Sequence, residues 1–242
     1  MLNPVLFTSH LPRRLTTSWR GINQIAVNKE SEYVYLRVPK AANSTILHLL
    51  YQHGSKDAFG NPPKRYITEQ WMSDMTTLSF RDGLRARREF TFFTFVRSPY
   101  SRVLSAFRNK FSSHVYLYKY SKKIDKYRGA DDSDFKSFLI YLKNGGLYKD
   151  QHWMPQVSFM WPTVGRVDFV GKVESLDRDM RTLLRKLYGD DYAVDHESIS
   201  SIRKGPPVTD SSNAIDEFYD KECRLIVQEL YRADFEQFGY SV

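Results

Sequence analysis

The sequence predicts an α/β fold with a central, mostly parallel β-sheet flanked by helices. Three apolar segments rich in aromatic and β-branched residues indicate buried strands, at residues 33–38, 90–96 and 167–173. A segment with helical periodicity follows each of them. Because strands that alternate with helices usually pair in parallel, the three strands are expected to share one sheet. The chain of 242 residues is 41% hydrophobic, enough for a sizeable core, and we expect a single domain spanning residues 1–242.

The first half of the chain holds two strand–loop–helix units. Residues 1–30 show no periodic pattern, which predicts an irregular N-terminal arm. The strand at 33–38 runs into the loop PKAANST and then the helix ILHLLYQH, which is expected to stop at Gly54. The strand at 90–96 precedes a helix with Pro99 in its first turn, where proline is favoured. The apolar face of that helix repeats at helical spacing: Tyr100, Val103, Leu104, Phe107 and Phe111.

The second half of the chain is mainly helical. Residues 113–128 alternate tyrosine and lysine, and residues 134–144 indicate a helix that ends at Gly145 and Gly146. The elements that follow are expected to be a strand at 167–173, an amphipathic helix at 175–188, a long loop at 190–212 and a closing helix at 218–239.

Basic side chains are concentrated in the first half of the chain. The formal net charge is +8, from 36 Lys and Arg against 28 Asp and Glu. Residues 1–129 carry 22 basic and 8 acidic side chains, a net +14, whereas residues 130–242 carry 14 and 20, a net −6. This split favours a specific anionic partner for the first half. The tyrosines and lysines of residues 115–128 suit an acidic sugar polymer, although an exposed basic helix explains the same pattern.

Composition excludes several classes of protein. Cys223 is the only cysteine, which excludes an internal disulfide framework and a cysteine-rich zinc site. Histidines and carboxylates lack the spacing of a metal site, so no metal is expected. No apolar run reaches the roughly 18 residues that a membrane span requires. Because the N-terminal residues lack the charged and cleavage regions of a secretory signal, we expect a soluble, cytoplasmic protein.

The loop after the first strand is the first candidate phosphate site. A loop between a buried strand and a helix directs backbone N–H groups along the helix axis, and the helix dipole adds positive potential. Lys40 supplies a point charge, and Ser44 and Thr45 supply hydroxyl groups at the helix start. The glycine pattern of nucleoside-triphosphate-binding loops is absent. An ordinary turn in which Asn43 or Ser44 caps the helix explains the segment equally well.

The loop after the second strand repeats this design. Arg97 directly follows the strand, and Ser105 lies further along the next helix. Ligands of open α/β sheets gather outside the carboxyl ends of the strands. Two strands that each deliver a cation and hydroxyl groups would hold two anionic groups of one ligand. A surface ion pair for Arg97 and a structural role for Ser105 are the alternatives.

The two segments together resemble a known enzyme family. RVPKAANST and FVRSPYSRVLSAFRNKF are similar to the paired donor-binding motifs of sulfotransferases, in particular the carbohydrate sulfotransferases that include the chondroitin and dermatan enzymes. QHWMPQ at 151–156, the segment 167–180 and the C-terminal helix extend the resemblance over residues 33–240. The resemblance implies a sulfotransferase fold like that of P-loop nucleotide hydrolases. It also implies in-line transfer of a sulfuryl group from 3′-phosphoadenosine 5′-phosphosulfate (PAPS) to a hydroxyl group of a carbohydrate or other small acceptor, acidic acceptors included. The implied product is adenosine 3′,5′-bisphosphate (PAP), and the reaction needs no metal.

The resemblance further assigns roles to individual residues. Lys40 would contact the 5′-phosphate and the bridging oxygen of the leaving group, and Arg97 and Ser105 would hold the 3′-phosphate. The other implied donor-binding residues are Ala42, Asn43, Ser44 and Thr45 around the 5′-phosphate, and Arg203, Lys204 and Gly205 as an element that closes on the 3′-phosphate. For this last element, a solvated pair of charges is the alternative.

His152 is the candidate general base for the acceptor hydroxyl. It lies in an aromatic-rich segment, and its family counterpart lies in a similar HWxPQ segment. Histidine is the side chain whose ordinary titration range suits proton transfer near neutral pH. A packing histidine is the alternative. Glu174 is the reserve candidate, although an ion pair at the end of a strand explains that residue too.

Some features depart from the family pattern. The residues Ala41, Ala42 and Asn43 stand where relatives often carry Gly, Cys or Thr, and Ser98 stands where Asp is usual. The missing membrane anchor and cysteines predict a soluble, bacterial-type member. Two other functions stay open: a kinase-like phosphotransferase, for which no convincing magnesium-binding Asp is found, and a non-enzymatic nucleic-acid-binding domain. Because the positive half contains both candidate phosphate sites, nucleic acid is not the expected partner.

Overall fold

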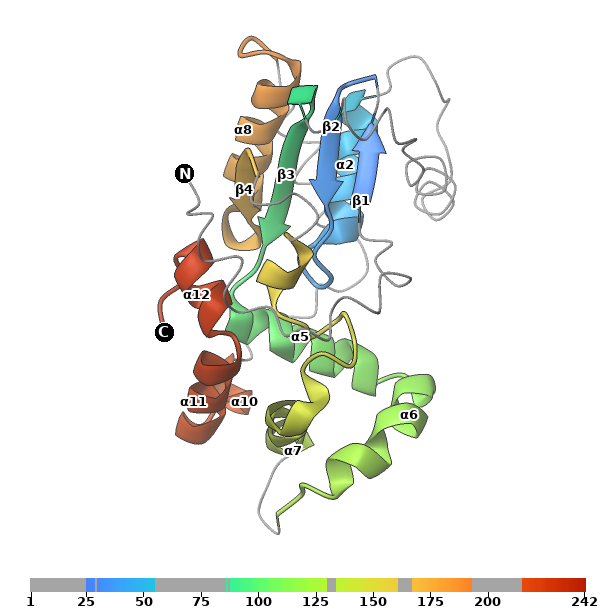
Figure 1. Cartoon of the computed structure of the whole chain (residues 1–242), viewed down its shortest axis with the longest axis vertical. Helices are drawn as coiled ribbons and strands as arrows, with labels where there is room; N and C mark the ends of the chain where they lie inside the picture. The colour runs from blue at the N-terminus through green and yellow to red at the C-terminus, as the bar shows by residue number, and fades with distance from the viewer. Residues whose placement is uncertain are drawn as a thin grey trace. The chain divides into compact units, whose positions relative to one another are not determined.

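The computed structural model describes residues 25–28, 30–54, 86, 88–129, 134–160, 167–192 and 215–242 (Figure 1). The chain divides into two compact units. Unit 1 comprises Met1–Val96 and Ser158–Gly205, and unit 2 comprises Arg97–Val157 and Pro206–Val242. Each unit is described by itself, and the assignment of the whole chain to one domain stays a prediction.

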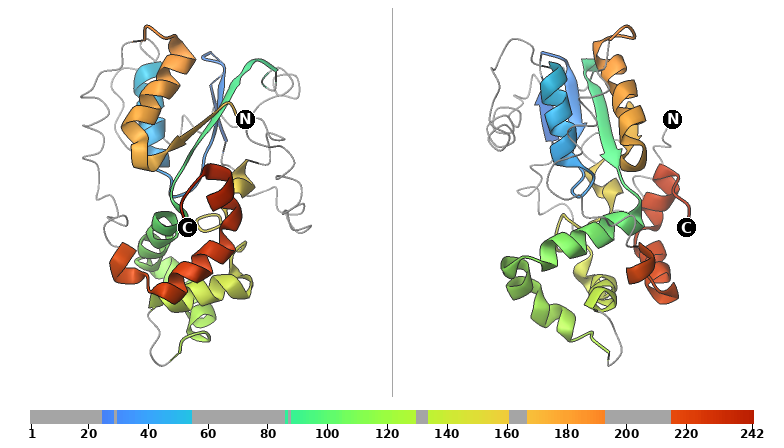
Figure 2. Two further views of the ribbon diagram at one scale, coloured as in Figure 1. Left: turned by 90° about the vertical axis from the view of Figure 1, so that its left-hand side faces the viewer. Right: turned by 180° about the vertical axis from the view of Figure 1, so that it is seen from behind.

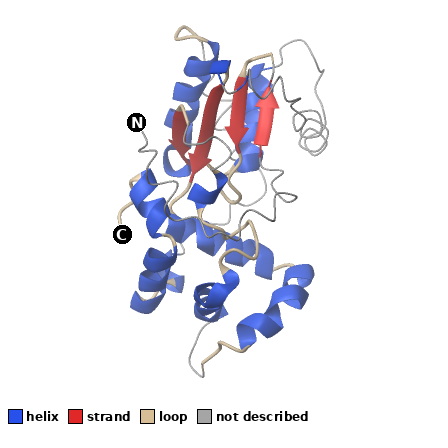
Figure 3. Ribbon diagram, viewed as in Figure 1, coloured by secondary structure: helices blue, strands red, loops and turns tan. Residues whose placement is uncertain are grey.

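Unit 1 is built on a four-stranded, mostly parallel sheet, which confirms the α/β prediction (Figure 3). Its strands are β1 Ile25–Asn28, β2 Tyr33–Leu36, β3 Thr91–Val96 and β4 Phe169–Lys172, in the order β1-β2-β3-β4. β2, β3 and β4 run parallel, and the three predicted strands correspond to them. The carboxyl ends of β2 and β3 are therefore neighbours in the sheet.

The strand β1 was not predicted. Residues 25–28 lie inside the segment expected to be irregular, and they pair antiparallel with β2 from Ile25 opposite Leu36 to Asn28 opposite Tyr33. A run of four residues is too short to show a periodic pattern. Pairing with the buried strand β2 satisfies its backbone N–H and C=O groups, and this long-range partner is what defines the strand.

Two helices of unit 1 pack on one face of the sheet (Figure 2). They are α2 Asn43–Gly54 and α8 Leu176–Tyr188, and the short 3-10 helix η6 Val173–Ser175 precedes α8. Both helices contact the aromatic side chains that β2 and β3 present to that face: Tyr33, Tyr35, Phe93 and Phe95. Burying a ring of this kind stabilises a fold by about 1.5–3 kcal/mol. Gly171 of β4 is required here, because a Cβ atom at that position would meet the Phe95 ring at 2.3 Å.

The described part of unit 2 is helical, with an aromatic core. Its helices are α5 Pro99–Phe111, α6 His114–Asp125, α7 Asp134–Tyr141, α10 Ile215–Phe218, α11 Lys221–Leu230 and α12 Arg232–Phe238. The predicted apolar face of α5 is confirmed, since all five of its residues belong to this core or pack against it. Trp153 lies fully buried within it, and its indole N–H donates to the Gly146 carbonyl at 3.0 Å.

Two predicted helices of unit 2 are interrupted. The helix expected over 134–144 is α7 followed by a π-helical turn, η3 Leu142–Gly146. The closing helix expected over 218–239 is wrong as one element, because Tyr231, with φ −113° and ψ 21°, separates α11 from α12. The Tyr231 hydroxyl donates to the buried Trp153 carbonyl at 2.5 Å. The break therefore coincides with a hydrogen bond to a residue far away along the chain. The periodicity of a single segment does not reveal such a partner.

Candidate functional site

The loop after β2 has an unusual backbone. Lys40 and Ala42 both adopt positive φ angles, 69° and 55°. Between them, Ala41 is buried and its N–H donates to the Val38 carbonyl at 3.2 Å, which closes a tight turn. We call residues 38–42 the Lys40 loop. Left-handed residues inside a turn can direct successive backbone N–H groups into one concavity, the arrangement that binds anions in phosphate loops.

The start of α2 differs from the expected cap. The Ile46 N–H donates to the Ala42 carbonyl at 3.0 Å, so Ala42 is the cap residue and Asn43 is the first helical residue. The alternative in which Asn43 or Ser44 caps the helix therefore does not describe this helix start. The Asn43 side-chain oxygen instead accepts a hydrogen bond from the Tyr35 hydroxyl at 2.8 Å. Since alanine carries no side-chain acceptor, this cap does not itself satisfy the first N–H groups of the helix.

The hydroxyl groups at this end of α2 lie in different surroundings. Ser44 is exposed and Thr45 is half-buried, as is Lys40. The structure thus places Lys40 and residues 42–45 together in one loop and the first turn of one helix. Their predicted role toward a phosphate stays a prediction.

Arg97, the first residue after β3, is fixed in unit 2 by Gln156. The Arg97 N–H donates to Gln156 Oε1 at 2.9 Å, and Gln156 Nε2 donates back to the Arg97 carbonyl at 2.8 Å. The Arg97 Nε–H donates to the Ser101 hydroxyl at 3.0 Å. Arg97 is only 8% exposed, so the alternative of a surface ion pair does not describe it. Its backbone and side chain are held in one orientation.

Ser105 lies two turns further along α5 and is 2% exposed. Arg102 of the same helix is also buried and donates from Nη1 to the Met154 carbonyl at 2.8 Å. Burial lowers the pKa of Arg102, and the carboxylate of Asp234 acts in the opposite direction. This face of α5 is therefore polar and buried, which sequence periodicity alone does not indicate.

Residues 150–157, which we call the His152 segment, are held by buried side chains from the C-terminal helices. Asp234 of α12 is fully buried and accepts the N–H groups of Gln156 at 2.8 Å and Val157 at 3.0 Å. Burial raises the pKa of Asp234 to about 6, although Arg102 and these N–H donors lower it. Sequence reasoning missed Asp234 and Gln156 because their partners lie far away along the chain.

His152 itself contacts a carboxylate that sequence reasoning did not single out. Its Nδ1 lies 2.6 Å from Asp150 Oδ1, and its backbone N–H donates to the same oxygen at 3.0 Å. The His152 side chain is 19% exposed and that of Asp150 is 8% exposed. Burial raises the pKa of Asp150, but hydrogen bonds from His152 and the charge of Lys119 outweigh it and bring the pKa below its usual value. An Asp two residues before a His is the local signal that could have revealed this pair.

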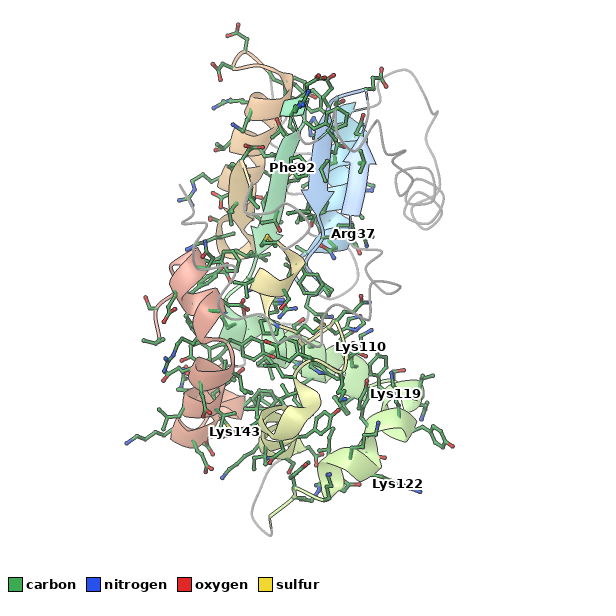
Figure 4. All side chains as sticks on the ribbon, in the orientation of Figure 1. Arg37, Phe92, Lys110, Lys119, Lys122 and Lys143 are labelled. Atoms are coloured by element: carbon green, nitrogen blue, oxygen red, sulfur yellow. The ribbon has the colours of Figure 1, made fainter. Side chains whose placement is uncertain are left out.

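Several lysines lie on α6, of which Figure 4 labels Lys119 and Lys122. Lys119, Lys122 and Lys123 are exposed, and the exposed basic helix offered as an explanation of residues 115–128 is thus present. The Lys119 ammonium lies 4.9 Å from the centre of the Tyr120 ring, and Lys110 of α5 lies 4.7 Å from that of Tyr116. These contacts hold the two ammonium groups against aromatic rings.

The remaining candidates lie elsewhere. Glu174 is exposed on η6 of unit 1. Arg203, Lys204 and Gly205 lie outside the described residues. Within the described ranges, no helix is long and apolar enough to cross a membrane, and no group of three His, Cys, Asp or Glu side chains is arranged to hold a metal ion.

Comparison with known proteins gives a consistent result. Residues 23–241 match the Sulfotransferase family. The chain is 27% identical to carbohydrate sulfotransferase 11 of Rattus norvegicus over 258 residues, which cover 95% of this chain and 70% of that protein. It is 30% identical to carbohydrate sulfotransferase 14 of Danio rerio over 183 residues, 69% of this chain and 48% of that protein. No solved structure matches significantly. The chain belongs to the sulfotransferase family, and specifically resembles its carbohydrate sulfotransferases.

Proposed function

We propose that this protein transfers a sulfuryl group from PAPS to a hydroxyl group of a carbohydrate acceptor. The observation that carries the proposal is the Lys40 loop, where two left-handed residues, one of them Lys40, precede the helix α2 in a chain of the sulfotransferase family. A phosphate group fits such a loop because backbone N–H groups, the helix dipole and an ammonium group act in the same direction.

The 5′ end of the donor is assigned to unit 1. Lys40 would balance the charge of the 5′-phosphate, and the N–H groups of residues 42–45 would donate to its oxygens. The hydroxyl groups of Ser44 and Thr45 are available for the same phosphate, because neither side chain is buried. Asn43 is assigned a different task from its neighbours: its side chain holds Tyr35, so it contributes its backbone N–H.

The 3′-phosphate is assigned to Arg97 and Ser105 of unit 2. Support comes from the way Arg97 is oriented, since Gln156 holds its backbone and Ser101 holds its Nε. A guanidinium group whose position is fixed in advance loses little conformational freedom when it binds a phosphate. Arg203, Lys204 and Gly205 keep their proposed role at the same phosphate on the resemblance alone.

The chemical step follows from these assignments. The acceptor oxygen forms a bond to sulfur while the bond from sulfur to the oxygen of the 5′-phosphate breaks, and PAP leaves. His152 accepts the proton of the acceptor hydroxyl, and Lys40 balances the charge that develops on the leaving phosphate. The products are a sulfate ester, PAP and a protonated imidazole, so atoms and charge balance. No residue of the chain is altered covalently.

The decisive experiment is binding of PAP followed by transfer. PAP should raise the thermal unfolding midpoint of the wild type by several degrees, because a ligand that binds only the folded state stabilises it. Lys40→Ala and Arg97→Ala should each weaken this response and lower the transfer of labelled sulfate from PAPS to a panel of glycans by about 10²-fold or more. Lys122→Ala, which removes an exposed lysine of α6, serves as the control with unchanged PAP binding.

Other outcomes would contradict the proposal in distinct ways. A response to ATP with Mg²⁺ but not to PAP would favour a phosphotransferase. Salt-dependent binding of DNA or RNA that survives Lys40→Ala, without a response to PAP, would favour a nucleic-acid-binding domain.

A further inference from the structure

The contact between Asp150 and His152 has the geometry of an oriented imidazole. Asp150 Oδ1 lies 2.6 Å from Nδ1 of the ring and also accepts the His152 backbone N–H at 3.0 Å. Its other oxygen, Oδ2, accepts a hydrogen bond from the Tyr120 hydroxyl at 3.4 Å. The ring nitrogen, the backbone N–H and the Tyr120 hydroxyl thus all contact one carboxylate. Together these contacts fix the orientation of the carboxylate relative to the ring.

The imidazole ring also contacts Tyr116 of α6. The two rings meet edge to face, with centroids 6.0 Å apart and planes at 86°, and the Tyr116 hydroxyl lies 3.3 Å from Nδ1. The next residue, Trp153, is fully buried and anchored through its indole N–H. His152 is therefore placed within unit 2 by contacts that do not depend on a ligand.

The charges around the pair favour an ionised carboxylate. Hydrogen bonds from His152 and the charge of Lys119 bring the pKa of Asp150 below its usual value in spite of burial. A carboxylate can only accept hydrogen bonds, so the ring nitrogen that faces it must carry a proton. This hydrogen-bond network assigns the proton of the neutral imidazole to Nδ1, which leaves the lone pair on Nε2.

We infer that Asp150 is a positioning residue that prepares His152 as the base of sulfuryl transfer, by holding the ring proton on Nδ1 and leaving Nε2 as the basic nitrogen. This inference rests on the proposed function. When Nε2 takes the proton of the acceptor hydroxyl, the ring becomes an imidazolium and Asp150 stays a carboxylate that stabilises it. The proton moves once, from the acceptor oxygen to Nε2, and none is transferred to Asp150.

The first test reads the ring proton directly. Long-range ¹H–¹⁵N correlation spectra of the ¹⁵N-labelled protein at pH 8.5 distinguish Nδ1–H from Nε2–H imidazoles, and His152→Gln identifies the His152 signals among those of the six histidines. The wild type should show the Nδ1–H form. A wild type in the Nε2–H form would overturn the inference. The tautomer is read on the wild type without an acceptor, and His152→Gln serves only to assign the signals.

The second test uses Asp150→Ala, which removes the acceptor of the Nδ1 proton, because a neutral imidazole without that acceptor favours the Nε2–H tautomer. The signals of His152 should change toward the Nε2–H form, and kcat for transfer should fall by about 10²–10⁴-fold, as expected for an imidazole in the wrong tautomer, while the affinity for PAP stays within about twofold. Asp125→Ala, which removes an exposed carboxylate of α6, is the matched control that should change neither quantity.

The two hypotheses fail in different ways. If the wild type neither binds PAP nor transfers sulfate, the proposed function is wrong, and the tautomer still decides whether Asp150 orients the ring. If transfer is present but Asp150→Ala keeps the wild-type tautomer and kcat, Asp150 has no positioning role.

Discussion

The Lys40 loop of unit 1 is shaped by its backbone, whereas the His152 segment of unit 2 is held by buried side chains. In the loop, two residues with positive φ and a tight turn precede α2. In the segment, Arg102, Asp234 and Tyr231 fix the main chain through hydrogen bonds. A backbone-built site should tolerate changes of side chain that preserve its φ angles, and a side-chain-built site should fail when one buried partner is lost.

The largest effect is expected from the loss of a buried partner. Asp234→Asn replaces a side chain whose two oxygens each accept one backbone N–H group with an amide that accepts through one oxygen only. The free energy of unfolding at pH 5 should fall by about 3 kcal/mol, and the thermal midpoint by about 6–12 °C. Urea and thermal unfolding measure this.

The control for this change is Asp216→Asn on α10, whose side chain is 95% exposed although it pairs with Arg224. Its midpoint should move by less than about 2 °C, because exposed ion pairs contribute little. Equal effects of the two substitutions would show that the His152 segment is not held by Asp234.

A smaller effect is expected in the pH dependence of the free energy of unfolding. Burial raises the pKa of Asp234 to about 6, from a usual value of 3.8. Because the folded pKa lies above the unfolded one, the stability contributed by the protonated acid is fully present below about pH 4 and is lost as the pH rises through 6. The difference in unfolding free energy between wild type and Asp234→Asn should therefore be smaller at pH 7.5 than at pH 5, by about 1 kcal/mol. A difference that stays constant across this range would mean that Asp234 does not titrate there.

The same contrast explains how much of the molecule the sequence could predict. The strands β2, β3 and β4 and the apolar face of α5 follow from local patterns, because each pattern reports burial along one segment. The strand β1 depends on its partner β2, and the break at Tyr231 coincides with an anchor at Trp153, 78 residues away along the chain. Local periodicity carries no information about such partners.

The residues of the candidate site also fall into two groups, those that a local motif reveals and those whose partners are distant along the chain. Lys40, Arg97 and His152 could be singled out because motifs are local, and the positive φ angles of the Lys40 loop could not, since neither Lys40 nor Ala42 is a residue type that favours them. Asp150 was within reach of sequence reasoning, because only one residue separates it from His152. Gln156 and Asp234 were not, since their roles exist only when α12 contacts the His152 segment.

The smallest effect tests the backbone-built region. Ala42 has a φ of 55°, a conformation that costs a residue with a Cβ atom about 1–2 kcal/mol and that glycine adopts freely. Ala42→Gly should therefore stabilise the protein, although the greater freedom of glycine in the unfolded chain and the lost methyl contact offset part of the gain. We expect an increase of about 0.5–1 kcal/mol, or about 1–3 °C in the thermal midpoint, with PAP binding retained. Ala41→Gly, in the same loop at a buried position without positive φ, should instead destabilise the protein. If both substitutions destabilise equally, the Lys40 loop is held by side-chain packing in the same way as the His152 segment, and the contrast between the two regions is lost.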